Sequence, residues 1–332
     1  MKGHLALMTR LSSVNSKIPQ LSEIQLRARD VLLEKIESKE YQLVDNPCPT
    51  CDSSHKDILI AQVDRYALPV TTKLCSLCGL LRTDPIMTED SYQDFYQHHY
   101  RSLYSGSEIA TDLFFADQFR RGNKLHKFLS QEVSLQGKTI LEVGVGAGGI
   151  LLALCQSGAI GIGCDFGDAY LAHAISKGLD VRSGGLAQFP DNAADVIVYS
   201  HVLEHISNLD GELTEVRRVL KNDGVLLINV PGIFSIHRDY AGDILQYLQN
   251  AHLFHFTKGS LNRLLRLNGF REVAANQRVV GIYSQSTDEL GGSRLASTNY
   301  RLLITYLYLC NFARPLLRIP HLIYPFVVNR RK

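Results

Sequence analysis

Residues 138–149, KTILEVGVGAGG, place an apolar run directly before a turn of glycines. The apolar run predicts a buried strand, and the glycines allow a tight turn in which the backbone can approach a ligand. We expect a helix from about Gly149 to Ser157, whose first N–H groups would face the turn. The segment is typical of a ligand-binding strand, turn and helix, although such a turn can also simply pack a strand against a helix.

The alternation of strands and helices continues to about residue 230. Apolar runs punctuated by Gly or Asp recur as AIGIGCD, DVRS, DVIVYS and GVLLINV, and each predicts a strand. Strands that alternate with helices form parallel sheets covered on both faces. The expected fold class is therefore α/β, with a doubly wound, mostly parallel sheet. The other expected elements are helices near Asp112–Leu129, Tyr170–Lys177, Leu213–Leu220 and Leu253–Gly269, a strand within Arg271–Val280, and a loop over 281–300.

Two acidic residues flank the glycine turn. Glu142 lies two residues before Gly144, where its carboxylate can receive an ammonium group through water or backbone. Asp165 ends the second strand, 21 residues after Gly144, and an acid there can accept hydrogen bonds from both hydroxyls of a ribose. A helix N-cap is the other role open to Asp165.

The stretches ILEVGVGAGG, GCD and DVIVYSHVLEHISNLDGELTEVRRVLKNDGVLLINVPG resemble the class I S-adenosylmethionine-dependent methyltransferases over about 138–280. The resemblance implies a Rossmann-like fold whose glycine loop cradles the methionine part of the cofactor. It also implies that an acid holds the ribose and that an aromatic ring packs on the adenine. The stretch SGGLAQFP has no acid where many members carry an adenine-binding Asp, so backbone groups around Leu186 are expected there. The implied cofactor-binding residues are Glu142, Gly144, Gly146, Gly148, Asp165, Phe166, Leu186, Ser200 and His201.

The motif SHVLEHI places two histidines at the expected end of the fourth strand. Methyl transfer to a hydroxyl needs a group that accepts the proton, and histidine is the natural base near neutral pH. We predict that His205 is the base and that His201 and Glu204 assist it, although His205 could instead hold a neighbouring loop. The alternative bases are His237, His252 and His255. Three aromatic side chains are expected to form a lid or to pack between modules: Tyr96, Tyr100 and Tyr104.

Four of the seven cysteines form two CxxC pairs, CPTC and CSLC. Each pair turns two sulfurs toward one point, and two pairs complete a tetrahedral zinc site. The predicted ligands of this closed, structural site are Cys48, Cys51, Cys75 and Cys78, with His55 as a less favoured substitute. The zinc would hold together a module with little core of its own. Because the N-terminus lacks a signal peptide's apolar core, we expect a cytoplasmic location, where reduced thiols favour a metal over disulfides.

Charge patterning limits the expected partners. The chain of 332 residues has a net charge of +2, and residues 45–105 hold five basic and eight acidic residues, which counts against nucleic acid. Residues 291–332 hold seven basic residues and no acid. This tail is also aliphatic and aromatic, so it favours peripheral contact with the inner membrane surface. A helical cap on the core is the alternative.

The order of modules is similar to that of bacterial deoxysugar C-methyltransferases and of methyltransferases linked with surface-polysaccharide synthesis. The similarity rests on the four-cysteine module, the stretch FYQHHYRSLYSG and the core that follows. Only a short tail follows the core, so we expect O-methylation of a sugar on a nucleotide- or lipid-linked glycan rather than C-methylation. The alternatives are an RNA methyltransferase that reads through the zinc module, and a non-catalytic scaffold. The expected organisation is a leader and helix (1–44), a zinc-ribbon-like module (45–105), linking helices (106–137), the core (138–280), and a loop with the basic helical tail (281–332).

Overall fold

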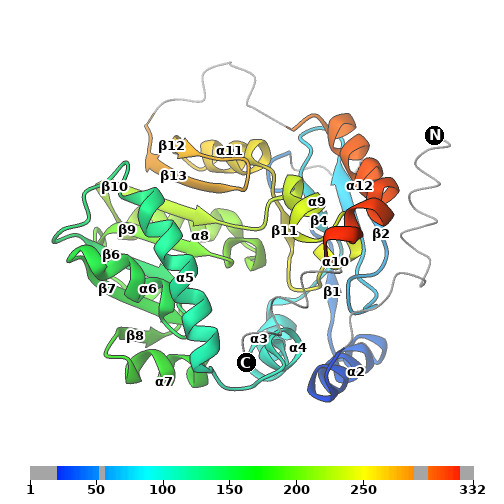
Figure 1. Cartoon of the computed structure of the whole chain (residues 1–332), viewed down its shortest axis with the longest axis horizontal. Coiled ribbons are helices and arrows are strands. Elements are labelled where there is room, and N and C mark those ends of the chain that lie inside the picture. Colours follow the sequence, from blue (N-terminus) through cyan, green and yellow to red (C-terminus); the bar gives the residue numbers. More distant parts are fainter. Residues whose placement is uncertain (1–20, 52–56, 288–297, 322–332) are drawn as a thin grey trace.

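The computed structural model describes residues 21–51, 57–287 and 298–321 of the chain. A seven-stranded sheet and a four-stranded sheet lie beside each other, each with helices packed against it (Figure 1). A short ribbon forms where β1 (Leu43–Val44) pairs with β5 (Ile86–Met87). The expected leader, His55 and the end of the basic tail lie outside the described residues.

The seven-stranded sheet confirms the expected mostly parallel core. Its spatial order is β8–β7–β6–β9–β10–β13–β12, in which the first five strands are parallel and β13 is antiparallel to both neighbours. Every residue of β9 is buried, as expected of a central strand covered on both faces. The carboxyl ends of the parallel strands meet at one edge, where ligands bind in such sheets. The strands are β6 (Thr139–Val143), β7 (Ile160–Asp165), β8 (Asp180–Ser183), β9 (Ala194–Ser200), β10 (Leu220–Asn229), β12 (Phe270–Ala275) and β13 (Val280–Gln285).

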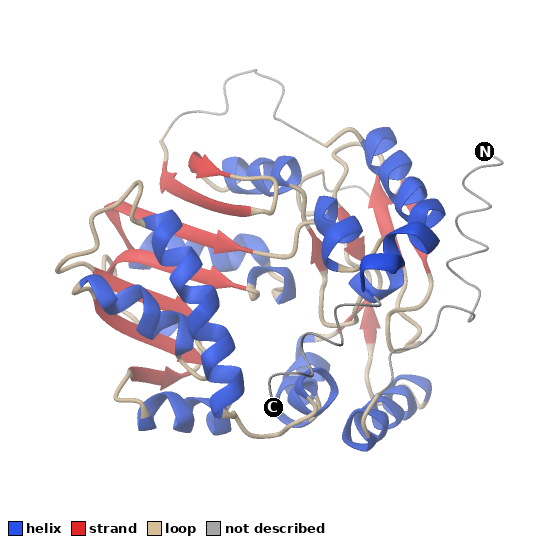
Figure 2. Cartoon of the chain, in the orientation of Figure 1, coloured by secondary structure: helices blue, strands red, loops and turns tan. Residues whose placement is uncertain are grey.

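Helices cover both faces of this sheet (Figure 2). α5, α6 and α7 share an apolar cluster with one face, through residues such as Leu125, Leu151 and Leu171, and α8 and α11 belong to the cluster on the other. α5 and α6 approach closely at Gly122, because a Cβ there would lie 2.6 Å from the Cβ of Ala153. These helices are α5 (Asp112–Leu129), α6 (Gly149–Leu154), α7 (Asp168–Ser176), α8 (Leu209–Val219) and α11 (Lys258–Leu267).

The helix expected over Leu253–Gly269 was wrong in its first turn. Phe254–His255 forms a short strand, β11, which pairs antiparallel with β4 of the second sheet. The helix α11 begins only after Thr257, whose side chain forms a capping box with Ser260. A capping box fixes a helix start by satisfying its first N–H groups, so the chain changes from strand to helix within two residues.

The loop expected over 281–300 was also wrong at its beginning. Val280–Gln285 forms β13, which buries Ile282 and Tyr283. The strand expected within 271–280 is β12, and a turn separates it from β13. The core sheet therefore reaches Gln285 and ends in an antiparallel hairpin.

The four-stranded sheet combines strands that are far apart in the sequence. Its order is β11–β4–β3–β2, so a strand from within the 138–280 region completes the sheet of the cysteine module. The fully buried Arg82 of this sheet connects two other segments. Its guanidinium lies 2.6 Å from Asp57 Oδ2 and donates a hydrogen bond to the Asn46 carbonyl. The N-terminal strands are β2 (Asp57–Ala61), β3 (Thr72–Cys75) and β4 (Leu81–Thr83).

The cysteine module shares its core with the large sheet. Leu80, Phe95 and Leu203 belong to one continuous cluster of buried apolar side chains. The expected module with little core of its own therefore packs its apolar side chains in a core that it shares with the neighbouring domain. Its helices are α2 (Glu23–Glu37), α3 (Glu89–His98) and α4 (Tyr100–Ser105).

The helix α12 (Tyr300–His321) forms the first part of the expected basic tail. It buries Leu303, Leu307 and Cys310 in a cluster with the second sheet and with α9 (Ile236–Asp239) and α10 (Ile244–Tyr247). The inner face of α12 is thus a cap on the protein. Within the described part of the chain, no helix combines the length and apolar character needed to cross a membrane.

Candidate functional site

The glycine turn after β6 has the backbone shape that the sequence predicts. Gly144, Gly146 and Gly148 have φ angles of 68°, 56° and 87°, a region that residues other than Gly rarely adopt. A Cβ on Gly144 would lie only 2.3 Å from a methyl carbon of Val202. The turn therefore needs glycine both for its conformation and for close packing against the loop after β9.

Asp165 lies at the end of β7, beside this turn. Its two carboxylate oxygens accept hydrogen bonds from the N–H groups of Gly146 and Gly167, each at 2.8 Å. Gly167 is the N-cap of α7, so the N-cap role considered for Asp165 does not apply. Because a carboxylate offers about four acceptor positions, Asp165 keeps capacity for the hydroxyls of a ligand.

Arg101 of α4 also reaches Asp165. Its guanidinium lies 3.6 Å from Asp165 Oδ2 and 4.0 Å from the ring centre of Tyr170. Sequence reasoning missed this residue, because Arg101 lies in the N-terminal module and nothing in its local pattern marks it. The N-terminal module therefore borders the edge of the expected cofactor site.

The expected adenine-binding residues are Phe166, which directly follows Asp165, and Leu186. The ring of Phe166 is 70% exposed and lies 3.7 Å from the position of a Cβ on Gly185. Leu186 is buried and begins a short 3-10 helix, Leu186–Gln188. An exposed ring facing a glycine backbone leaves a flat apolar surface suited to a base.

Glu142 is buried beneath the glycine turn. Only 1% of the residue is exposed, and its Oε2 has no hydrogen-bond partner among the described residues. Burial raises the pKa of this carboxyl well above its usual range. An unpartnered polar atom in such a position is costly, so a bound ammonium group or water is the expected partner.

The candidate catalytic residues follow β9. Ser200 ends the strand and accepts a hydrogen bond from the Asn229 amide at 3.0 Å. His201 has a φ of 59°, a strained conformation for a residue other than glycine and common at functional sites. The next residues form a short 3-10 helix, Leu203–His205, which turns Glu204 toward the interior.

Glu204 and three histidines form the group that we call the glutamate–histidine cluster: His201, Glu204, His205 and His252. Glu204 Oε1 lies 3.8 Å from His201 Nδ1, 4.0 Å from His205 Nε2 and 3.8 Å from His252 Nε2. The structure thus brings together the three predicted catalytic residues. It adds His252, which the sequence offered only as an alternative base.

Burial sets the protonation of this cluster. It raises the pKa of Glu204 to about 8 and lowers the pKa of His205 to about 3. The pKa of His252 is also lowered well below its usual value, first by burial and then by its histidine neighbours. Neutral imidazoles are therefore favoured near neutral pH. Each keeps an unprotonated ring nitrogen that can bind a metal ion, whereas the lowered pKa makes His205 and His252 weak proton acceptors.

Aromatic side chains of the N-terminal module cover the cluster. The Tyr96 hydroxyl lies 3.2 Å from His205 Nδ1, and the Tyr100 ring lies 5.9 Å from the His205 ring. The Tyr104 ring packs against the Tyr100 ring in a tilted arrangement, with 4.8 Å between ring centres. Of the two expected roles, packing between the modules is the one that the structure shows.

The other alternative histidines lie apart from the catalytic group. His255 is buried 5.9 Å from the His252 ring, and neither of its ring nitrogens has a hydrogen-bond partner in the described part of the chain. His237 contacts the Tyr306 hydroxyl of α12. Neither residue reaches Glu204 within 4 Å.

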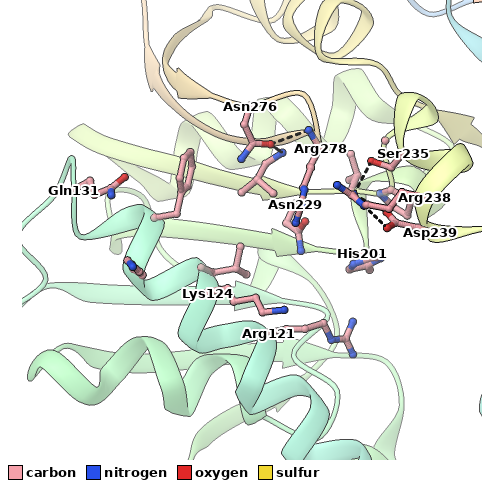
Figure 3. A pocket seen from close by; sticks show the side chains of 17 residues that line it. Arg121, Lys124, Gln131, His201, Asn229, Ser235, Arg238, Asp239, Asn276 and Arg278 are labelled. Carbon is pink, nitrogen blue, oxygen red and sulfur yellow. Dashed lines mark hydrogen bonds and ion pairs between the residues drawn. The ribbon is translucent and has the colours of Figure 1, made fainter. Parts of the chain in front are cut away.

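A pocket of about 490 Å³ opens beside His201. Figure 3 shows Arg121 and Lys124 projecting from α5 toward the strand ends that carry His201 and Asn229. The charged residues that line it are five cations and one acid: Arg121, Lys124, Lys127, Arg238, Arg278 and Asp239. This excess of positive charge next to a predicted catalytic histidine suits an anionic ligand.

The four cysteines also meet, as the sequence predicts. Their sulfurs all lie within 4.8 Å of one another, and none is in a disulfide. Zinc–sulfur bonds of about 2.3 Å in a tetrahedron would separate the sulfurs by about 3.8 Å, and Cys48 and Cys78 already lie 3.5 Å apart. Contact with Cys75 is the first of the effects that raise the pKa of Cys48 to about 11. A divalent cation would reverse that effect by stabilising thiolates, so this donor set fits zinc.

The comparisons with known proteins concern mainly the core. A family model described as a methyltransferase domain matches residues 114–275, a range that begins after the four cysteines. The chain is 30% identical over 158 residues to a probable S-adenosylmethionine-dependent methyltransferase of Mycolicibacterium smegmatis, which covers 46% of this chain and 58% of that protein. It is 32% identical over 164 residues to a ubiquinone biosynthesis O-methyltransferase of Pseudomonas entomophila, which covers 47% of this chain and 68% of that protein.

One of the solved structures that align with part of this chain is also a methyltransferase. The magnesium protoporphyrin IX methyltransferase of Synechocystis PCC 6803 aligns with 60% of this chain and 100% of its own, at 14% identity and a TM-score of 0.44. The match to the first relative spans little more than half of that protein.

Proposed function

Because the chain belongs to the S-adenosylmethionine-dependent methyltransferase family, we propose that it methylates a hydroxyl of a sugar linked to a nucleotide or lipid phosphate. When bound, S-adenosylmethionine supplies an electrophilic methyl group on a sulfonium. The protein must hold the acceptor oxygen in line with the carbon–sulfur bond. The oxygen gains the methyl group, the sulfur keeps the bonding electron pair, and the hydroxyl proton passes to a protein base.

The observation that carries the cofactor proposal is the unsatisfied site beneath the glycine turn. Glu142 is buried with an unpartnered oxygen, while Asp165 and the exposed Phe166 follow at the next strand end. An ammonium group, a ribose and an adenine would satisfy these three features in order. The remaining expected contacts are the glycines of the turn, the backbone near Leu186, and the side chains of Ser200 and His201.

The acceptor proposal rests on the cationic pocket. Phosphate groups are bound by Arg and Lys side chains, and this pocket offers several beside His201. His205, the base predicted from the sequence, is not among the residues that line the pocket, whereas His201 lines it and lies 3.8 Å from Glu204. These observations support His201, rather than His205, as the group that would take the acceptor's proton. Glu204 and His205 belong to the same cluster and would orient His201.

The test of this proposal is methyl transfer from labelled S-adenosylmethionine to nucleotide sugars, lipid-linked sugars and RNA. We expect uptake by a phosphate-linked sugar and release of S-adenosylhomocysteine. Lys124→Ala should raise the KM for that acceptor about tenfold without changing the cofactor affinity, since it removes one phosphate contact. Arg120→Ala is the matched control, because Arg120 lies on the same helix but outside the pocket and pairs with Asp117.

Two outcomes would contradict the proposed function. Methyl uptake by RNA alone would favour the nucleic-acid alternative. Tight cofactor binding without any release of S-adenosylhomocysteine, across all acceptors, would favour a non-catalytic scaffold.

We also propose that the four cysteines hold one structural zinc ion. All four positions are filled by protein ligands, as in closed structural sites. The zinc would join the loop near Cys48 to the β3–β4 turn that carries Cys75 and Cys78. Such a site stabilises the module and takes no part in methyl transfer.

Finally, we propose that the outer face of α12 contacts an anionic membrane surface. Leu302, Leu309 and Phe312 share this face and are between 56% and 69% exposed, while Arg301 lies beside them. Apolar side chains with adjacent positive charge favour such surfaces. Sedimentation with phosphatidylglycerol vesicles should be lost in a Leu309→Ser/Phe312→Ser variant; equal sedimentation of both proteins would reject this contact.

A further inference from the structure

Three metal-binding groups meet between the two sheets, away from the cysteines. One ligand atom each from Glu204, His205 and His252 lies within 4.8 Å of the other two. The distances from Glu204 Oε1 are 4.0 Å to His205 Nε2 and 3.8 Å to His252 Nε2. Hydrogen bonds between such atoms span about 2.7–3.2 Å, so these groups face one another without bonding directly.

Burial makes this arrangement costly as it stands. Glu204 is 1% exposed, and neither carboxylate oxygen has a hydrogen-bond partner among the residues that the structure describes. His205 and His252 have side chains that are 11% and 5% exposed. Buried polar groups are normally satisfied by protein, water or an ion, and a cation would satisfy all three groups at once.

A neighbouring side chain fixes one of the ligands. The Tyr96 hydroxyl lies 3.2 Å from His205 Nδ1, so that nitrogen is engaged and Nε2 is the one that faces Glu204. Histidines that bind metals commonly use their second ring nitrogen in this way. The Gln249 amide contacts His252 Nε2, and a metal ion would replace that contact.

We propose that Glu204, His205 and His252 form a second metal site, which takes a divalent first-row transition ion such as zinc or cobalt. Two imidazoles and a carboxylate are a donor set that such ions prefer. Bonds of about 2.1 Å in a tetrahedron would separate the ligand atoms by about 3.4 Å, so the group has to contract only slightly. Three protein ligands leave a coordination position open, as in catalytic rather than structural sites.

The position of the site suggests its use. It lies next to His201, which lines the cationic pocket. A divalent ion near the acceptor would lower the pKa of a coordinated hydroxyl. This role rests on the proposed function, whereas binding of the ion does not.

The test uses the full chain, first loaded with zinc and then freed of excess metal by gel filtration. Titration with Co²⁺ should add one equivalent per chain, with the visible absorption of cobalt bound to nitrogen and oxygen. The near-ultraviolet charge transfer of a cobalt thiolate should be absent, since the cysteines already hold zinc. Glu204→Gln and His252→Gln should each weaken Co²⁺ binding at least tenfold.

His255→Gln is the matched control. His255 is buried on the same segment, but it is not among the converging ligand atoms, so its loss should leave Co²⁺ affinity unchanged. Circular dichroism and thermal unfolding of each variant check that the fold is intact, and His205→Gln replaces any variant that does not fold.

Three outcomes overturn the proposal: no second equivalent at millimolar Co²⁺, unchanged affinity in folded Glu204→Gln and His252→Gln, or a thiolate charge-transfer band showing that cobalt went to the cysteines. Methyl transfer is assayed separately. Cobalt binding without methyl transfer would leave the metal site standing and reject only the activity, and methyl transfer without a second equivalent would do the reverse.

Discussion

The four-cysteine cluster and the glutamate–histidine cluster are both largely buried groups of side chains of the types that can bind metals, yet they are assembled differently. The cysteines come as two CxxC pairs, on loops joined by one small sheet. The second cluster takes His201, Glu204 and His205 from one loop and His252 from a segment about 50 residues later. The local spacing of the cysteines thus predicts the first cluster, whereas tertiary packing brings the residues of the second together.

The largest expected effect follows from breaking the cysteine cluster. If the cysteines hold the proposed zinc, Cys75→Ser should abolish zinc binding and lower the free energy of unfolding by several kcal/mol, because binding of structural zinc is coupled to folding. Metal analysis and thermal unfolding measure this. Cys155→Ser, outside the cluster, should keep both zinc and stability; loss of stability without any zinc in the wild-type chain would contradict the zinc assignment.

Asp165 is another feature that the local sequence predicts, and it belongs to neither cluster. Asp165→Asn should weaken S-adenosylmethionine binding by about 1–3 kcal/mol, because it removes a charged acceptor of hydrogen bonds. Calorimetry on the zinc-loaded protein gives the affinity. Asp168→Asn is the neighbouring control, exposed at the start of α7. Equal affinity in the Asp165 variant and the wild type would remove Asp165 from the cofactor site.

The ion pairs of Asp195 in the core allow a third comparison, in which no metal-binding group takes part and a smaller effect is expected. Partial burial raises the pKa of Asp195, but hydrogen bonds from Lys221, the Thr139 N–H and Lys138 outweigh it and lower the pKa to about 2. The folded state therefore favours the ionised form. This stability is present above the pKa of about 4 in the unfolded chain and is lost as the pH falls toward 2.

Asp195→Asn should consequently cost about 1–2 kcal/mol of unfolding free energy at pH 7, and the difference from wild type should shrink steeply as the pH falls to about 2. Urea unfolding at several pH values measures it, with Asp180→Asn as an exposed control. A difference that stays constant down to that pH would show that the charge of Asp195 is not responsible. Zinc content and cofactor affinity should be unaffected.

The smallest expected effect concerns the contact between the N-terminal module and the glutamate–histidine cluster. Tyr96→Phe removes the hydroxyl beside His205 Nδ1, which should lower the unfolding free energy by about 0.5–1.5 kcal/mol. Tyr308→Phe, on an exposed part of α12, should have no measurable effect. If both variants unfold alike, the Tyr96 contact does not stabilise the junction.

Local patterns predict the core well where an element packs against elements that are close to it in the sequence. The helix expected over 112–129 coincides with α5, and the glycine turn has the expected backbone form. Prediction fails near residue 254, where the helical pattern extends too far back. The pairing of β11 with β4 decides that segment, and no local periodicity reports a partner strand about 170 residues away.

The sequence by itself determined the parallel core, the glycine turn beside Asp165, and the meeting of the four cysteines, because each depends on short-range spacing or on one repeating strand–helix unit. Only the tertiary structure decided that Arg101 reaches Asp165, that Tyr96 covers His205, and that His252 faces Glu204. Those contacts form because the two sheets share one core, and because β11, from within the core region of the sequence, pairs in the sheet of the cysteine module. Burial at this junction, rather than any motif, gives Glu204 and its histidines their altered pKa values.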